Sequence, residues 1–115
     1  MALFKKTSPI DCMIDKIKNT PNSKIYIHPT LENLKQYDVK HNTDYVTTLR
    51  EYILSFKDLS LTADKLNIHR NSLKYRLQKI TDISNINFSD QLLCAQLLCN
   101  FYMIDEDTRP DKILM

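Results

Sequence analysis

The 115-residue sequence contains no glycine, although average usage of about 7% would supply about eight. Loops that cradle phosphates in Walker and dinucleotide-binding motifs need glycine, because their backbone N–H groups must approach the ligand closely. Both kinds of nucleotide site are therefore excluded. Left-handed turn positions, which glycine usually fills, must fall to other residues, mainly to the nine asparagines.

Long apolar runs are also missing. No stretch approaches the roughly 18 apolar residues that cross a membrane, and the first ten residues, MALFKKTSPI, lack the apolar segment of a signal peptide. These absences predict a cytoplasmic protein with no membrane partner.

Cysteine is scarce, and its spacing points to no site. Cys12, Cys94 and Cys99 form no C-x-x-C pair, so neither a disulfide framework nor a zinc site is indicated, and we expect buried, reduced thiols. The histidines form no HExxH motif, and no serine or cysteine lies in a local nucleophile motif. We therefore expect no catalytic residue, metal or cofactor, and an enzyme is the least favoured class.

What the sequence does contain is helical periodicity. Hydrophobic residues make up 43% and charged residues 26%, enough for one core. The segment 24–27 alternates briefly, and we favour an extended buried segment over a strand because no second strand is available to pair with it. The expected fold is all-α with about six helices, over residues 9–19, 31–38, 44–56, 61–66, 70–81 and 90–104.

Two of these helices carry notable apolar patterns. Within 44–56, a stripe at helical spacing consists of Tyr45, Leu49, Tyr52, Ile53 and Phe56. The helix 90–104 is apolar nearly all round, which indicates burial by the core and by a second subunit. A homodimer is therefore expected.

The segment 61–81 meets the demands of a helix-turn-helix. Ala63 is small enough to let a second helix cross closely, and Asn67, four residues later, is the best substitute for the glycine that usually turns the corner. Leu66 and Ile68 flank this turn. The spacing predicts a left-handed Asn67 and an inner face on the second helix made by Leu73, Leu77 and Ile80.

Positive charge is concentrated in the same segment. The formal net charge is only +2, yet residues 65–79 carry five Lys or Arg residues and no acidic residue. Taken alone, such a run is more often a solvated face than a binding site. Combined with the helix-turn-helix spacing, it favours binding of double-stranded DNA.

The second helix supplies the candidate contacts. Arg70, in its first turn, is the strongest candidate for a base contact, because arginine can bind guanine bidentately. Arg76 is equally consistent with a phosphate clamp and a structural ion pair, and His69 with a base or phosphate contact and a simple helix cap. The predicted base contacts are His69, Arg70, Asn71, Lys74 and Tyr75, and the predicted phosphate contacts are Thr62, Ser72, Arg76, Gln78 and Lys79.

The run TADKLNIHRNSLKYRLQKI, residues 62–80, resembles the helix-turn-helix of the PucR/CdaR family of bacterial transcription regulators. The segments HPTLENLKQYD, residues 28–38, and TTLREYI, residues 47–53, also fit the pattern of that family. The resemblance implies a C-terminal DNA-binding domain with a Fis-like tri-helical core that lacks a wing and has additional flanking helices, whose second helix enters the major groove. In that family the module follows a larger sensory domain.

The expected organisation is an N-terminal helical extension over 1–24, the DNA-binding domain over 25–104 and an acidic tail over 105–115. The chain is then either a fragment of a longer regulator or a short regulator, and any effector metabolite is sensed by a domain absent from it. The alternative function is a helix-turn-helix used for protein–protein interaction without DNA binding. That use would need an apolar outward face on 70–82, where the sequence is polar and cationic.

Overall fold

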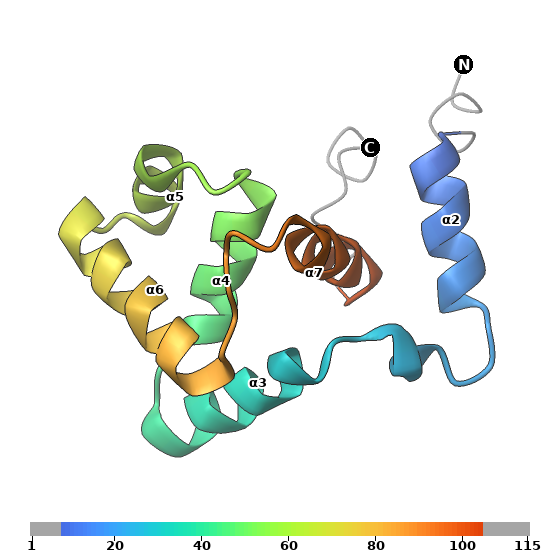
Figure 1. Ribbon diagram of the computed structural model, residues 1–115, viewed down its shortest axis with the longest axis horizontal. Helices are drawn as coiled ribbons and strands as arrows, with labels where there is room; N and C mark the ends of the chain where they lie inside the picture. Colours follow the sequence, from blue (N-terminus) through green and yellow to red (C-terminus); the bar gives the residue numbers. More distant parts are fainter. Residues whose placement is uncertain (1–7, 105–115) are drawn as a thin grey trace. The chain divides into compact units, whose positions relative to one another are not determined.

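The computed structural model describes residues 8–104 and is all-α, with no strand in that range. This confirms the predicted fold class (Figure 1). No helix within these residues is long and apolar enough to cross a membrane. The predicted acidic tail, 105–115, lies outside the described residues. The elements are α2 (Pro9–Lys18), the 3-10 helix η1 (Ser23–Tyr26), α3 (Pro29–His41), α4 (Tyr45–Leu54), α5 (Leu59–Leu66), α6 (Arg70–Ser84) and α7 (Gln91–Ile104).

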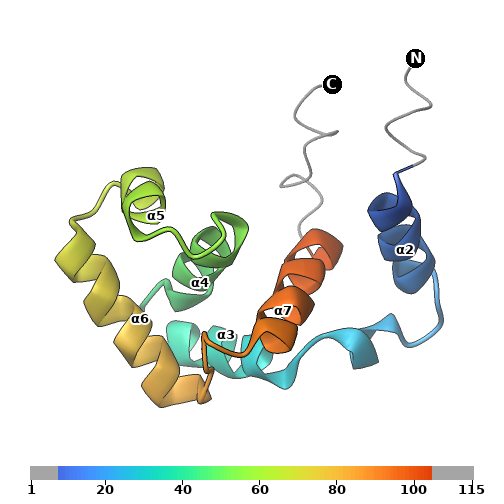
Figure 2. The same ribbon diagram turned by 45° about the horizontal axis from the view of Figure 1, so that its top comes forward.

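The described residues divide into two compact units, 28–98 on the one hand and 8–27 with 99–104 on the other. In the unit 28–98, α4 contacts α3, α5 and α6, and α6 contacts α3 and α5 as well. Figure 2 shows the short turn that joins α5 to α6, with α4 beside both. Fully buried side chains from three helices, α3, α4 and α6, make this core: Leu34, Leu49, Leu73 and Ile80.

Asparagine takes the place of glycine at the left-handed C-terminal caps of three helices in this unit. Asn42, Asn67 and Asn85 follow α3, α5 and α6, and each has φ between 54° and 59°. Asn22, before η1, adopts the same region with φ of 60°. The prediction drawn from the missing glycine is thereby confirmed, because asparagine tolerates this conformation better than most residues.

Two predicted features are wrong. The segment 24–27 is not extended and buried: residues 23–26 form η1, and the side chain of Ile25 is 73% exposed. Because the described residues offer no strand for pairing, the backbone of this segment forms local hydrogen bonds. The N–H of Ile27, for example, donates to the carbonyl of Lys24. The stripe of α4 also ends early, since the helix stops at Leu54 and Phe56 is exposed.

The end of α4 uses two consecutive left-handed residues that are not asparagine. Phe56 and Lys57 have φ of 55° and 63°. The backbone N–H of Lys57 donates to the carbonyl of Tyr52 at 2.9 Å, which closes the helix. The ammonium of Lys57 donates to the carbonyl of Phe88 at 3.0 Å, so a contact distant in sequence holds this turn. The two left-handed residues are the physical reason why apolar periodicity overestimated the length of the helix.

The cysteines are less buried than predicted. Cys12 is exposed, and Cys94 and Cys99 are half-buried. The prediction of a buried thiol is therefore wrong for Cys12. On α7, Leu92 in the first turn is 81% exposed in the single chain, and burial of this helix by a second subunit stays a prediction.

A carboxylate on α3 caps the start of α4. Asp38 accepts hydrogen bonds from the backbone N–H groups of Tyr45 and Val46 at 2.8 and 2.9 Å, and another from the hydroxyl of Thr43. These bonds satisfy N–H groups that the helix cannot satisfy itself. The cap thus comes from seven residues upstream rather than from Asp44, which immediately precedes the helix.

We expect Asp38→Ala to lower the free energy of unfolding by about 1–2 kcal/mol, the usual effect of removing a helix cap. Asp38→Asn keeps one acceptor oxygen and should lose less. Urea denaturation followed by circular dichroism measures both. Equal losses in the two variants would contradict the hydrogen-bonding role of this side chain.

Candidate nucleic-acid interface

The turn between α5 and α6 has the geometry that the sequence predicted. Asn67 is left-handed, with φ of 56° and ψ of 46°. Its N–H donates to the carbonyl of Asp64 at 3.1 Å, and the N–H of Ile68 donates to that of Ala63 at 3.0 Å. This pair of bonds is a Schellman motif, which ends a helix sharply. Because α6 starts only three residues after Asn67, the motif sets where its first turn lies.

The inner face of α6 is also as predicted. Leu73, Leu77 and Ile80 are buried in the core of the unit. On the opposite side, Asn71, Tyr75 and Asp82 are exposed. The outward face is therefore polar along its length, apart from the ring of Tyr75.

His69 caps the N-terminus of α6. Its Nδ1 accepts a hydrogen bond from the backbone N–H of Asn71 at 3.0 Å. A neutral imidazole that accepts at Nδ1 carries its hydrogen on Nε2. Because the side chain is exposed, that N–H is directed to solvent as a hydrogen-bond donor. The two roles left open for His69, helix cap and DNA contact, are therefore compatible.

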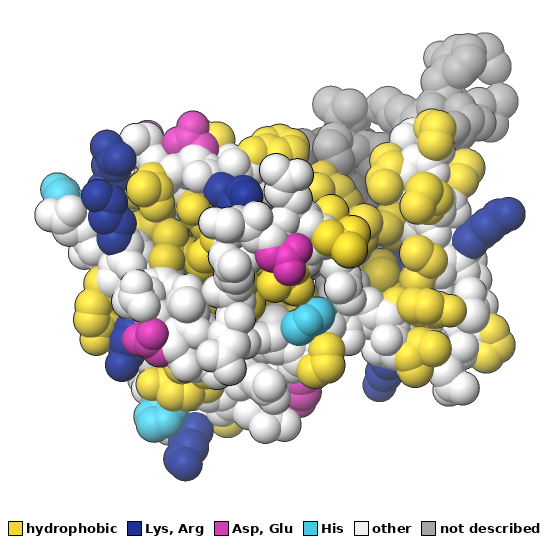
Figure 3. Space-filling view, viewed as in Figure 1, with side chains coloured by type: hydrophobic (Ala, Val, Ile, Leu, Met, Phe, Trp, Pro, Cys, Tyr) yellow, Lys and Arg dark blue, Asp and Glu magenta, His cyan; other side chains and the backbone are white. Residues whose placement is uncertain are grey.

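Cationic side chains lie on both flanks of α6. Arg70 and Lys74 are exposed, and Lys74 borders a surface hollow with Leu59 of α5. Arg76 lies on the other flank, where it reaches Asp44 at the start of α4. Figure 3 shows Lys and Arg side chains gathered at the edge formed by α5 and the start of α6. Such a surface attracts a polyanion.

Arg76 forms a structural ion pair. Its Nη1 lies 3.1 Å from Oδ1 of Asp44 and 3.4 Å from the hydroxyl of Thr48, and its side chain is 28% exposed. Of the two roles left open for this residue, the geometry favours the tie between α6 and α4. Partly exposed pairs of this kind contribute little to stability, so its main effect is to orient the helix.

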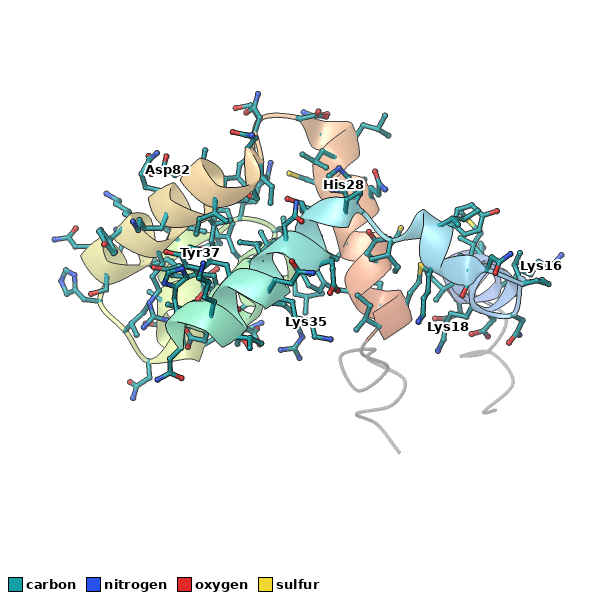
Figure 4. All side chains as sticks on the ribbon, turned by 90° about the horizontal axis from the view of Figure 1, so that it is seen from below. Lys16, Lys18, His28, Lys35, Tyr37 and Asp82 are labelled. Carbon is teal, nitrogen blue, oxygen red and sulfur yellow. The ribbon has the colours of Figure 1, made fainter. Side chains whose placement is uncertain are left out.

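A tyrosine cluster lies along the side of α6 that faces α3. The ring centroids of Tyr37 and Tyr45 are 5.8 Å apart, and Tyr37 points from α3 toward α6 (Figure 4). Burial, with smaller effects from Tyr75 and Tyr37, raises the pKa of Tyr45, whereas Lys79 and Arg76 act in the opposite direction. The charge of Lys79 therefore acts on the hydroxyl of Tyr45.

Two predicted phosphate contacts have other partners. Thr62 is fully buried and its hydroxyl donates to the carbonyl of Asp58 at 2.7 Å, so its assignment as a phosphate contact is wrong. It lies one residue before Ala63, on the inner face of α5. Gln78 is exposed, but its amide donates to Asp82 at 3.0 Å. The structure brings the other predicted contacts together on one helix and its cap: His69, Arg70, Asn71, Ser72, Lys74, Tyr75, Arg76 and Lys79.

One neighbour of this surface was not predicted from the sequence. Residues 42–44 join α3 to α4 and lie beside α6, as the pairing of Asp44 with Arg76 shows. The two residues are 32 positions apart in the sequence. Charge and periodicity along a single helix cannot reveal such a contact.

Comparison with known families agrees with this geometry. The family model described as the PucR C-terminal helix-turn-helix domain matches residues 45–101. That range starts at α4, includes all of α5 and α6, and ends within α7. The matched segment therefore contains the complete helix-turn-helix.

Curated relatives show the same similarity. The DNA-binding transcriptional activator AdeR of Bacillus subtilis (strain 168) is 36% identical over 61 residues, 53% of this chain and 14% of the relative. The proline-responsive transcriptional activator PutR of the same organism is 32% identical over 79 residues, 69% of this chain and 19% of the relative. An uncharacterized protein of Haemophilus influenzae is 46% identical over 50 residues, which is 44% of this chain and 14% of the relative. No solved structure matches.

Proposed function

Because residues 45–101 belong to the PucR C-terminal helix-turn-helix family, we propose that this protein regulates transcription by sequence-specific binding of duplex DNA, with α6 in the major groove. One observation carries the proposal. The outward face of α6 is polar and carries cations on both flanks. The helix begins directly after a turn that has the geometry of a helix-turn-helix. Helices of about 10–12 Å diameter fit a major groove about 12 Å wide.

The residues divide by their place on α6. We assign base contacts to the first two turns and the cap, where a recognition helix meets base edges. Phosphate contacts fall to the flanks. Asp82, exposed near the C-terminal end, would repel phosphates, so the DNA contact ends before the last turn of the helix. The base-contacting set is His69, Arg70, Asn71, Lys74 and Tyr75, and the phosphate-contacting set is Ser72, Gln78 and Lys79.

The wider biology belongs to the proposal too. A homodimer would place two copies of α6 in successive major grooves on an inverted-repeat operator. The protein would act in the bacterial cytoplasm, without enzymatic activity. The chain spans 14–19% of the lengths of the curated relatives cited above, and any effector would be sensed outside the residues that bind DNA. The division into 1–24, 25–104 and 105–115 remains part of this proposal.

The decisive experiment is selection of bound duplexes from a random library. The proposal expects enrichment of a sequence made of two inverted half-sites about one helical turn apart. Enrichment of a single half-site would contradict the proposed dimer and support the proposed recognition helix. If no duplex is bound at low salt, the alternative of a protein-interaction module is favoured.

We expect Lys79→Ala to weaken binding to all duplexes alike and to reduce the slope of log affinity against log salt by about one, because one phosphate contact releases about one counterion. Fluorescence anisotropy with a labelled duplex over a salt series measures this slope.

The control is Lys35→Ala. Lys35 is exposed on α3 and points away from α6 (Figure 4). Its loss changes the net charge equally and should leave the slope nearly unchanged. The same slope in both variants would show that Lys79 acts through net charge rather than through a phosphate contact.

A further inference from the structure

Beside the recognition helix lies a cleft of about 590 Å³. One wall is the corner between α3 and α4, residues 42–45, and the other is the flank of α6 with Asn71, Ser72, Tyr75 and Arg76. Both walls belong to the unit 28–98. None of the DNA contacts predicted from the sequence lies on the corner.

We propose that this cleft holds one sugar-phosphate strand of the DNA whose major groove α6 enters, an inference that rests on the proposed function. The lining supports this occupant. Asparagine, serine, threonine, tyrosine and arginine side chains are the usual donors to phosphate oxygens and sugars in protein–DNA complexes. Asparagine, serine and tyrosine side chains of this kind line the cleft, whereas the hydroxyl of Thr43 donates to Asp38 and Arg76 pairs with Asp44.

The cleft lies where one of the two DNA strands that border the major groove would pass. Arg70 and Lys74 lie on the flank of α6 toward α5, and the cleft lies on the other flank. A helix seated in the groove has one strand on each side, because its diameter and the groove width are nearly equal. The flank of α6 toward α5 would then contact one DNA strand, and the corner 42–45 would contact the other.

The corner is rigid enough to position a strand. Asn42 is left-handed, with φ of 54°, and the N–H of Thr43 donates to the carbonyl of Asp38 at 3.1 Å. The carboxylate of Asp38 holds the next N–H groups, those of Tyr45 and Val46. The side chain of Asn42 remains exposed at the mouth of the corner. A backbone held in this way lowers the ordering cost of binding at the corner.

The charges of the cleft do not oppose a phosphate. Asp44 is its one acidic lining residue, and the guanidinium of Arg76 lies 3.1 Å from it. The pair is close to neutral. Lys79 acts electrostatically on Tyr45, another lining residue, so a cation stands near the cleft.

A pair of asparagine substitutions tests the inference. Asn42 and Asn85 are both exposed, both left-handed and both at the C-terminal cap of a helix, α3 and α6 respectively. Asn85 does not line the cleft. Aspartate tolerates the same backbone region, so Asn42→Asp and Asn85→Asp add the same charge with the same backbone cost.

We expect Asn42→Asp to weaken binding to random and selected duplexes by about 3- to 10-fold at low salt, because a carboxylate would face a phosphate. The difference should shrink as salt rises. Asn85→Asp should change affinity by less than about 2-fold under the same conditions. Anisotropy titrations with the full chain measure all three affinities, and thermal unfolding checks that the variants are folded.

Asn42→Gly provides a second variant, since glycine keeps the left-handed backbone and removes only the amide. It should weaken binding by about 2- to 5-fold. Equal effects of Asn42→Asp and Asn85→Asp, or unchanged affinity in Asn42→Gly, would overturn the assignment of the cleft while leaving DNA binding by α6 in place. Absence of salt-dependent duplex binding by the unaltered protein would overturn the proposed function itself, and the cleft with it.

Discussion

Leu73→Ala is expected to lower the free energy of unfolding by about 2–5 kcal/mol, the range for removing a fully buried leucine side chain. Leu73 has no solvent exposure and lies in the first turns of α6, which contacts α3, α4 and α5. The substitution removes apolar contacts and leaves a cavity where these helices meet. Small domains are stable by about 5–15 kcal/mol, so the loss is a large share of the total.

The control is Val39→Ala on α3. Val39 is 81% exposed, so removing its methyl groups should lower the free energy of unfolding by less than about 0.5 kcal/mol. Urea denaturation of both variants gives the comparison. Similar losses of unfolding free energy in the two variants would mean that Leu73 does not pack α6 against the core. The assignment of the outward face of α6 would then be wrong.

The features that the sequence predicts best are those set by neighbouring residues. Asn67 follows a small residue, Ala63, at the spacing of a helix-turn-helix corner, in a chain with no glycine to turn it. Its left-handed backbone and the bonds around it follow from these local facts. The buried face of α6 is equally local, since it follows from helical periodicity alone.

Features that depend on another element escape such reasoning. The pairing of Arg76 with Asp44 joins residues on different helices, so the sequence left its role open between phosphate clamp and ion pair. Thr62 has a residue type suited to phosphate contact, yet α5 turns its side chain into the core. Phe56 fits the apolar stripe of α4, but the helix stops at Leu54 and the backbone of Phe56 is left-handed.

The cap of α6 shows how one residue can serve fold and function together. A capping side chain normally comes from Ser, Thr, Asp or Asn, and an aspartate here would place a negative charge against the DNA. The imidazole of His69 caps through Nδ1 and keeps a donor on its other nitrogen. Histidine makes the same cap at α3, where Nδ1 of His28 accepts from the N–H of Thr30. Under the proposed function, the cap at α6 leaves a donor on His69 for the DNA.

Arg70→Ala is expected to weaken binding to the selected operator by about 1–3 kcal/mol, or about 5- to 150-fold, and to flatten the preference for one base pair. Arg70 is the first residue of α6 and is exposed. From that end of a recognition helix a guanidinium can donate two hydrogen bonds to O6 and N7 of guanine. Titrations against the operator and its single-base variants at fixed salt measure both effects.

Arg70→Lys separates charge from geometry. Lysine keeps the positive charge but lacks the planar fork that binds guanine bidentately. This variant should retain the salt slope of the unaltered protein and lose most of the base preference, whereas Arg70→Ala loses both. If Arg70→Lys preserved the preference, the bidentate geometry of the guanidinium would not be its source. If Arg70→Ala left operator affinity unchanged, base recognition would belong to the remaining residues of the first turns, Asn71, Lys74 and Tyr75.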